Sequence, residues 1–297
     1  EDIGNYFGAG SGAFNWHENQ YDIILKPGSK IGDDVTIISQ SPESNIKLIA
    51  ELKTAAKGTG DQAYIFFTPN SSVNYIRGTI PVGNESFTVK AAAADAVNLF
   101  SNKMNNALKQ SGYQDVEVKS VQNYDRKAFQ QINQTLLYSF FSPTLDSINY
   151  WFLKKSVNLF GESFVKSIGY EKRKTGSTDS GVSVIRDFWS KNGINKSALK
   201  MIDGSGLSPA NRVTTKALVT VMQFAKSRPW FDSFFHALPE MNGIKMKDGY
   251  IGGVRSYTGY IRSKNGNEFI FSFIVNNFDG NPGTAREKMW KVLDILK

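Results

Sequence analysis

The pattern over residues 253–296 restricts the possible folds more than any other part of the chain. Two runs of β-forming residues, 253–262 and 268–276, flank the sequence Lys-Asn-Gly-Asn at 264–267, which is typical of a tight hairpin turn. A Pro-Gly pair at 282–283 then precedes apolar residues at helical spacing. The sequence therefore predicts an antiparallel hairpin followed by a C-terminal amphipathic helix. The apolar stripe of this helix consists of Ala285, Met289, Val292, Leu293 and Leu296.

The first 90 residues show a different, β-rich pattern. Short runs of β-branched, aromatic and aliphatic residues occur at 21–25, 35–38, 63–67 and 75–80, and most of them stop at Pro, Gly or Asn. Over 91–112 the apolar residues change to helical spacing, and a Ser-Gly pair ends the run. This part of the chain is predicted to be an α+β module of modest size.

The composition changes near residue 140, so we divide the chain into two domains, 1–138 and 139–297. In the second domain Phe-Ser-Pro at 141–143 is typical of a helix entry. Loop signals cluster at 174–181, and a glycine-rich turn is expected at 203–206. Further helices are predicted at 159–168, 182–192 and 214–227.

Charge separates the two halves as well. Residues 1–140 carry 12 basic and 14 acidic side chains, whereas residues 141–297 carry 23 basic and 13 acidic ones, a net charge of +10. The basic second half favours an anionic partner. This partner could be nucleic acid, an acidic polymer or a carboxylate-bearing substrate, and charge alone does not choose among them. No signature of a nucleic-acid-binding module is present.

The composition also excludes several classes of site. The chain has no cysteine, which excludes disulfide scaffolds, thiol nucleophiles and cysteine-held metals. Its two histidines, His17 and His236, are far apart, which argues against a histidine zinc site, and we expect neither metal nor cofactor. No apolar run approaches the ~18–20 residues that a membrane crossing needs. Residue 1 is Glu without a leader pattern, so a processed or truncated start is expected.

Three short strings carry a family resemblance. They are Ser-Val-Asn at 156–158, Asp-Gly-Ser-Gly-Leu-Ser at 203–208 and Lys-Asp-Gly-Tyr at 247–250. In this order and spacing they resemble the D-alanyl-D-alanine carboxypeptidase/endopeptidase family, the class C low-molecular-mass penicillin-binding proteins. These enzymes use Ser-x-x-Lys, Ser-x-Asn and Lys-Thr-Gly as active-site motifs. The string at 203–208 is the most specific match, and we expect it to form a structural turn.

The resemblance extends along the whole chain. Tyr-Phe-Gly-Ala at 6–9, Ala-Phe-Asn at 13–15 and Arg-Gly-Thr-Ile-Pro at 77–81 are similar to strings of the family's inserted domain, and 142–145 precedes the Ser-x-Asn as it should. The match is to roughly the C-terminal two-thirds of a member. It implies an α+β fold in which an inserted α+β domain precedes a serine β-lactamase/transpeptidase-like domain, an antiparallel sheet flanked by helices.

The resemblance also implies roles for individual residues. Ser156 would relay a proton between the nucleophile's lysine partner and the leaving amine, and Asn158 would hydrogen-bond the acyl-side amide of the peptide. Lys247 would place positive charge near the substrate's terminal carboxylate. The backbone N–H of Tyr250 would donate to the oxyanion, and Gly249 would let the substrate approach the strand.

The nucleophile of the family, in Ser-x-x-Lys, precedes every string matched here. The chain contains three such sequences, at 44–47, 163–166 and 197–200. The first falls in the segment that resembles the inserted domain, and the other two follow Ser156, which reverses the motif order. We interpret all three as chance matches, so the chain by itself is predicted to be inactive.

The third motif departs from the family as well. Asp248 stands where the family has Thr or Ser, and an ionised Asp beside the substrate's carboxylate would repel it, unless a neighbour such as Arg255 neutralises it. A literal Lys-Thr-Gly at 174–176 lies in a polar loop, so Lys247 is the better assignment. Arg212 would supply compensating positive charge near the site.

The function predicted from the resemblance is a serine-type D-Ala-D-Ala carboxypeptidase or endopeptidase that acts on peptidoglycan stem peptides through an acyl-enzyme. It implies inhibition by β-lactam antibiotics and a periplasmic or other extracytoplasmic location in the cell envelope. The alternative is a non-catalytic, degenerate member that binds peptidoglycan. A third hypothesis, nucleic-acid binding by the basic half, predicts salt-sensitive binding to DNA. The oligomeric state is left open by the sequence.

Overall fold

A computed structural model divides the chain into two units, residues 1–141 and 142–297. The boundary expected from composition, between 138 and 139, lies close to this division, while the identity of the first unit as an inserted domain stays a prediction. The structure describes residues 2–42, 47–67, 73–83, 85–93, 95–118 and 135–297.

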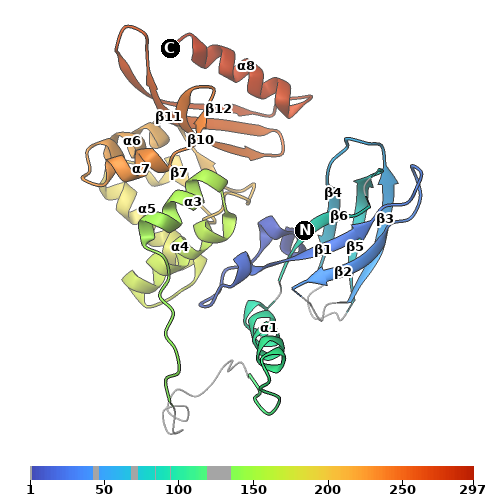
Figure 1. The fold of residues 1–297 in the computed structure, drawn as a ribbon. Coiled ribbons are helices and arrows are strands. Elements are labelled where there is room, and N and C mark those ends of the chain that lie inside the picture. Colours follow the sequence, from blue (N-terminus) through green and yellow to red (C-terminus); the bar gives the residue numbers. More distant parts are fainter. Residues whose placement is uncertain (1, 43–46, 68–72, 84, 94, 119–134) are drawn as a thin grey trace. The chain divides into compact units, whose positions relative to one another are not determined.

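Two three-stranded sheets build the first unit (Figure 1). In one sheet β1 lies between β2 and β6 and is antiparallel to both; in the other β5 lies between β3, which is parallel to it, and β4, which is antiparallel. Buried residues of both sheets, such as Tyr21 and Ile76, share one core. The elements are η1 (Asp2–Gly4), η2 (Tyr6–Gly8), η3 (His17–Asn19), β1 (Gln20–Lys26), β2 (Thr36–Ser41), β3 (Lys47–Ala55), β4 (Gln62–Phe66), β5 (Val73–Pro81) and β6 (Phe87–Ala92).

The helix expected over 91–112 is shorter than predicted. It is α1 (Ala96–Gln110), and Asp95 caps its first turn by accepting a hydrogen bond from a backbone N–H. Ala91 and Ala92 belong to β6 instead, where they pair with β1 and are buried. The prediction was wrong at these two residues because alanine fits a close-packed strand as well as a helix. The strands β3 and β6 were not predicted.

The second unit contains a four-stranded antiparallel sheet of order β12-β11-β10-β9 between helices (Figure 1). Side chains alternate between the two faces of a strand. On β11, Tyr257 and Ile261 face α8, where they share a core with Met289 and Leu293. The elements are α3 (Leu145–Lys155), α4 (Asn158–Arg173), α5 (Thr178–Lys191), η4 (Lys196–Ala198), β7 (Leu199–Lys200), β8 (Arg212–Val213), α6 (Thr215–Lys226), α7 (Phe231–Ala237), β9 (Glu240–Met241), β10 (Ile244–Ile251), β11 (Val254–Arg262), β12 (Glu268–Asn276) and α8 (Pro282–Asp294).

Helices α3, α6 and α7 cover the opposite face of this sheet. Leu153 of α3, Met222 of α6 and Ala237 of α7 form a buried cluster against which Tyr260 of β11 packs. The Tyr260 hydroxyl donates a hydrogen bond to the carbonyl oxygen of Met222 at 2.9 Å. The expected fold class, an α+β chain with an antiparallel sheet flanked by helices, is confirmed.

Most elements of this unit follow the sequence pattern, with three corrections. The hairpin and the final helix are present as β11, β12 and α8, but Val292 of the apolar stripe is 51% exposed. Helix α5 begins at Thr178, inside the loop predicted at 174–181, because Ser177 caps it by accepting a hydrogen bond from the N–H of Ser180. The helix α7 was not predicted.

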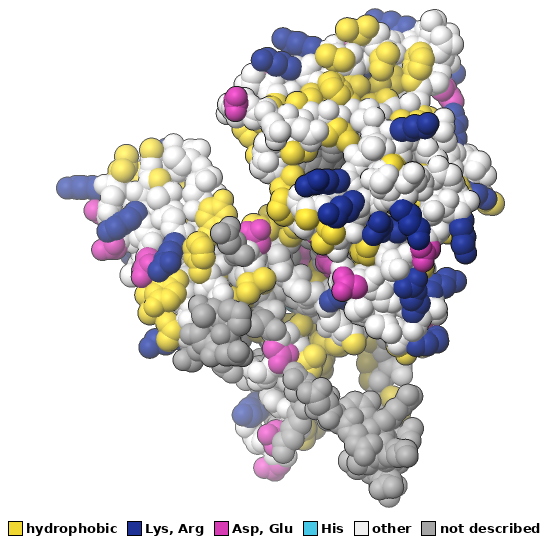
Figure 2. Space-filling view, turned by 180° about the vertical axis from the view of Figure 1, so that it is seen from behind, with side chains coloured by type: hydrophobic (Ala, Val, Ile, Leu, Met, Phe, Trp, Pro, Cys, Tyr) yellow, Lys and Arg dark blue, Asp and Glu magenta, His cyan; other side chains and the backbone are white. Residues whose placement is uncertain are grey.

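The charge asymmetry seen in the sequence is visible on the surface. Figure 2 shows lysine and arginine side chains over much of the visible face of the C-terminal unit, with few acidic ones among them. Five lysines and arginines of this unit form ion pairs that the structure describes, with Asp187, Glu268, Asp248 and Asp294 as the acidic partners. None of the described helices is long and apolar enough to cross a membrane.

Candidate functional site

The Ser-x-Asn string lies at the junction between α3 and α4. Helix α3 ends at Lys155, and Ser156 caps it in the left-handed conformation (φ 54°, ψ 45°), which residues other than glycine adopt infrequently. The chain is extended at Val157, and α4 begins with Asn158. Ser156 is exposed and Asn158 is half-buried. This sharp turn therefore presents the serine to solvent and starts the next helix with the asparagine.

Helix α4 is in very close contact with the glycine-rich turn at 203–206. A β-carbon added to Gly161 would overlap the carbonyl oxygen of Gly204, and one added to Gly204 would overlap the carbonyl oxygen of Gly161. The added β-carbon at Gly204 would also lie 2.8 Å from Cγ2 of Val165. Glycine is thus required at both positions for helix α4 and the turn at 203–206 to approach each other this closely.

Hydrogen bonds from two backbone N–H groups to a carboxylate fix the same contact. Oε1 of Glu162 accepts hydrogen bonds from the N–H groups of Gly204 (2.8 Å) and Ser205 (2.9 Å). Within the turn, the carboxylate of Asp203 accepts from the N–H groups of Gly206 and Ser208, both at 2.7 Å. The string at 203–208 is therefore a turn held by two carboxylates, as expected, and it is attached one helical turn after Asn158.

The third string lies on β10, next to the hairpin strand. Lys247 pairs with Thr258 of β11, and the pairing continues to Ile251 opposite Val254. On its other side β10 pairs with β9 only at Ile244 and Lys245. Among the residues that the structure describes, 247–251 has a strand partner along one edge only, and on the other edge the carbonyl oxygen of Asp248 accepts from the side chain of Lys247.

Lys247 and Asp248 form an ion pair. The Lys247 Nζ lies 3.0 Å from Oδ1 of Asp248 and 2.9 Å from the carbonyl oxygen of the same residue. Neighbouring side chains on a strand point to opposite faces, so the lysine must bend around the strand to reach both oxygens. The two side chains are partly buried, with 24% of Lys247 and 38% of Asp248 exposed.

Arg255 does not neutralise Asp248. Its Nη1 donates a hydrogen bond to the hydroxyl of Tyr257 at 3.2 Å, and its guanidinium lies 4.9 Å from the ring centre of Tyr250. The cation that pairs with Asp248 is therefore Lys247 and not Arg255. Tyr250 itself is 53% exposed and pairs in register with Arg255.

Gly249 also has little room beside its neighbour on β11. It lies opposite Ser256 on β11, and a β-carbon at this position would lie 2.7 Å from the hydroxyl oxygen of that serine. Any larger residue would therefore displace Ser256 before a ligand is considered.

The two other positively charged candidates, Arg212 and Lys174, belong to elements other than β10. Arg212 is exposed on β8, where it pairs in register with Lys200. Lys174 caps the C-terminus of α4, with its ammonium 5.5 Å from the ring centre of Tyr170. As expected, the literal Lys-Thr-Gly at 174–176 is not on a strand, whereas Lys247 is.

The three Ser-x-x-Lys sequences show no common setting. Ser163 lies within α4, and Ser197 lies in η4, where its hydroxyl donates to Oδ1 of Asn195 at 2.9 Å. Ser44 lies outside the described residues. Among the described residues no cluster of three potential metal-binding side chains is found.

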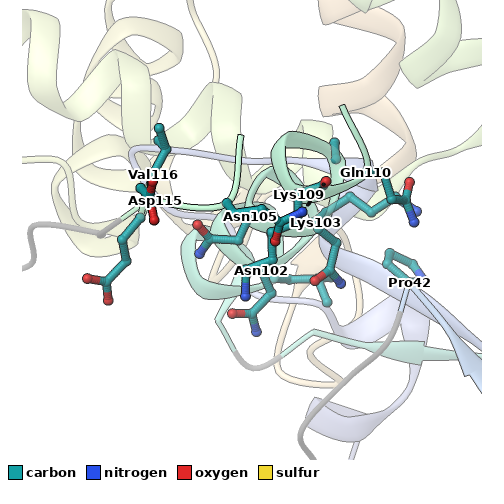
Figure 3. A pocket seen from close by; sticks show the side chains of 13 residues that line it. Pro42, Asn102, Lys103, Asn105, Lys109, Gln110, Asp115 and Val116 are labelled. Atoms are coloured by element: carbon teal, nitrogen blue, oxygen red, sulfur yellow. Dashed lines mark hydrogen bonds between the residues drawn. The ribbon is translucent and has the colours of Figure 1, made fainter. Parts of the chain in front are cut away.

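A polar hollow in the first unit contains none of the predicted site residues. It measures about 780 Å³ and lies along α1 and residues 114–117, with Pro42 at its rim. Figure 3 shows amide and lysine side chains of α1, including Asn102 and Lys103, along this hollow. Asn105 accepts a hydrogen bond from the N–H of Val118 and donates one to its carbonyl oxygen, so part of the wall is fixed by the chain itself.

Comparison with known proteins gives consistent matches. The model of the D-Ala-D-Ala carboxypeptidase 3 (S13) family matches residues 1–295. A D-alanyl-D-alanine carboxypeptidase of Actinomadura sp. (strain R39) is 25% identical over 280 residues, which cover 87% of this chain and 51% of the relative. A penicillin-sensitive carboxypeptidase A of Dictyostelium discoideum is 26% identical over 316 residues, covering 93% of this chain and 58% of the relative.

Solved structures agree on the fold. Penicillin-binding protein 4 of Haemophilus influenzae has a TM-score of 0.73 at 18% identity, covering 95% of this chain and 65% of that one. The same protein complexed with a β-lactam has a TM-score of 0.71. The chain spans about half the length of the curated relatives it matches and about two-thirds of this solved chain.

Proposed function

The chain belongs to the D-Ala-D-Ala carboxypeptidase 3 (S13) family, and from this membership we propose that it carries two of three active-site motifs of a serine peptidase. The enzyme hydrolyses D-Ala-D-Ala, or D-Ala-diaminoacyl, bonds in peptidoglycan stem peptides through an acyl-enzyme. The observation that carries the proposal is the clamp between α4 and the turn at 203–208, which fixes the start of α4 and with it Ser156 and Asn158.

The helical side of the site handles protons and the acyl-side amide. Ser156 is exposed at a sharp junction, so its hydroxyl is accessible to relay a proton between the nucleophile's lysine partner and the leaving amine. Asn158, at the first position of α4, hydrogen-bonds the amide on the acyl side of the scissile bond. A residue that bonds substrate must be held rigidly, and the Glu162 hydrogen bonds supply that rigidity.

The sheet side of the site binds the substrate backbone. The open edge of β10 at 247–251 allows an extended peptide to lie alongside as a further strand. Gly249 leaves room for it, and the N–H of Tyr250 donates to the oxyanion. Lys247 places a cation at this edge. Arg212 adds positive charge to the same C-terminal unit, which attracts the anionic peptide.

The remaining properties follow from the same chemistry. Acyl transfer by a serine needs no metal or cofactor, and β-lactams inhibit it because they acylate the same nucleophile. Peptidoglycan lies outside the cytoplasmic membrane, so the protein works in the periplasm or elsewhere in the cell envelope. The net charge of +10 over residues 141–297 suits an acidic polymer.

A fluorescent penicillin tests this proposal on the whole protein that contains the chain. Covalent labelling, together with release of D-alanine from a pentapeptide, supports it. A protein that folds but neither takes the label nor releases D-alanine contradicts it.

The second candidate function is peptidoglycan binding without cleavage. The observations that favour it are the Lys247–Asp248 pair and the lack, within these 297 residues, of a Ser-x-x-Lys that precedes all the strings matched to the family. Sedimentation of the unlabelled protein with purified cell-wall sacculi, combined with an absence of labelling by penicillin, supports this function over the first.

A further inference from the structure

The side chain of Lys247 contacts the next residue along the strand, Asp248. Its ammonium bonds to two oxygens of Asp248, the carbonyl at 2.9 Å and the carboxylate Oδ1 at 3.0 Å. The positive charge at the open edge of β10 is therefore accompanied by a negative charge of equal size. A ligand that reaches this edge meets an ion pair and not an isolated cation.

The ion pair changes which chemical groups the edge accepts. A free carboxylate gains attraction from Lys247 but loses much of it to repulsion by Asp248, because the two opposite charges lie only 3.0 Å apart. An amide carries no charge and has N–H donors, which a carboxylate accepts strongly. The second oxygen of this carboxylate, Oδ2, accepts no hydrogen bond from any residue that the structure describes, and the side chain is 38% exposed.

Among the described residues, no other cation forms an ion pair with Asp248, although Arg255 lies diagonally across from it on the same face of the sheet. Arg255 is engaged by the hydroxyl of Tyr257 and the ring of Tyr250. On the helical face, Lys245 donates to the carbonyl oxygen of Leu238 at 3.3 Å. Within the described part of the sheet, Lys247 is thus the one cation in ion-pair contact with Asp248.

We propose that Asp248 is a specificity-determining residue that disfavours peptides with a free C-terminal carboxylate and favours those with an amide in its place. The substrate that fits that description is a stem peptide with a C-terminal carboxamide, whose N–H donates to the Asp248 carboxylate. An internal crosslink whose nearest carboxylate lies elsewhere avoids the repulsion but gains no such hydrogen bond. This inference rests on the proposed function of the β10 edge as the substrate site.

The test compares two peptides that differ in one group. Both end in D-Ala-D-Ala, one as the free acid and the other as the carboxamide, and hydrolysis of the same peptide bond releases D-alanine or D-alaninamide. With the whole protein, kcat/KM for the carboxamide should exceed that for the acid by about tenfold, the factor that ~1.4 kcal/mol produces. In Asp248→Thr and Asp248→Asn, kcat/KM should increase more for the free acid than for the carboxamide, so that the preference for the carboxamide disappears.

Salt distinguishes a charge effect from a change of shape. Repulsion between partly exposed charges is screened by salt, so raising the ionic strength should increase turnover of the acid by the wild-type protein more than by Asp248→Asn. The matched control is Asp279→Asn, which removes a carboxylate from the exposed loop between β12 and α8. This control should leave the preference unchanged.

Equilibrium binding of the two peptides gives a readout that does not need turnover. A preference for the carboxamide that disappears in Asp248→Thr supports the inference even if the protein only binds peptidoglycan. Equal affinities and equal turnover of the two peptides in the wild-type protein overturn it while leaving the peptidase function standing. A protein that takes no penicillin label and cleaves neither peptide refutes the peptidase function, and the binding comparison then decides the inference.

Discussion

Gly161 of α4 and Gly204 of the glycine-rich turn face each other with each carbonyl oxygen in the space that the other's β-carbon would fill. This contact joins the helix that begins with Asn158 of the first motif string to the second string, at 203–208. It explains why the turn at 203–206 is needed next to the Ser-x-Asn string whether or not its residues touch substrate.

Replacing Gly161 with Ala should destabilise the C-terminal unit. Alanine favours a helix over glycine by about 1 kcal/mol, but overpacking against a backbone carbonyl costs about 1–3 kcal/mol and must move the turn. The net result is a lower free energy of unfolding, measured by urea denaturation. The matched change Gly176→Ala, where the added β-carbon would meet only Cβ of Tyr170 at 3.9 Å, should be close to neutral. Equal stability of the two variants would refute the contact.

Lys247 and Lys174 provide a test of where the third motif lies. In the whole protein, Lys247→Ala should lower turnover of a D-Ala-D-Ala peptide by at least ~10²-fold, the scale of losing one preorganised electrostatic group. Lys174→Ala should have almost no effect, because Lys174 caps α4 beside Tyr170. Steady-state kinetics with both variants decide the assignment, and the reverse result would assign the motif to 174–176.

The 297-residue chain by itself should not be acylated by a labelled penicillin. Its Ser-x-x-Lys sequences either follow Ser156 or fall in the segment that resembles the inserted domain, so none stands where the family has its nucleophile. Mass spectrometry after incubation with penicillin G is the measurement. Recovery of a penicilloyl group on Ser163 or Ser197, or on Ser44, would contradict this expectation.

Local signals predicted the hairpin well, and non-local pairing explains most of what was missed. The Asn-Gly turn at 265–266 fixes the register of β11 and β12 from neighbouring residues alone. Strand β3, by contrast, gains its place by parallel pairing with β5 across the intervening strand β4, which no local pattern specifies. In α7 the residues Phe231, Phe234 and Phe235 have helical spacing, but aromatic residues also favour strands, and a helix of seven residues gives too short a pattern to recognise.

The candidate site was predicted as a set of residues but not as a set of contacts. The string spacing identified Ser156, Asn158 and Lys247, and their catalytic roles stay predictions. Glu162 was missed, although it directly follows Gly161 and the carboxylate-to-turn hydrogen bonds require an acid at that place. The pair between Lys247 and Asp248 was missed as well, because adjacent strand residues are expected to point to opposite faces.

Tyr260 makes the free energy of unfolding of the C-terminal unit depend on pH in the alkaline range. Burial raises the pKa of its phenol above the ordinary value of 10.0, and the neutral hydroxyl donates to the carbonyl oxygen of Met222. Above pH 10 the unfolded chain loses this proton while the folded chain keeps it, so the unfolded state is favoured and the free energy of unfolding falls as pH rises. Below pH 10 both states are protonated and the contribution is complete.

Replacing Tyr260 with Phe removes this titration while keeping the ring in the cluster of α3, α6 and α7. At pH 8 the variant should lose about 1 kcal/mol, the net contribution of one hydrogen bond, because Met222 lies within α6 and its carbonyl oxygen keeps a helical donor when the Tyr260 hydroxyl is removed. Between pH 9 and pH 11 its free energy of unfolding should fall less steeply than that of the wild-type protein. Urea denaturation at several pH values measures both effects. Tyr170→Phe, on the exposed surface of α4, is the control and should keep the wild-type slope; an unchanged slope in Tyr260→Phe would show that this hydroxyl is not the titrating group.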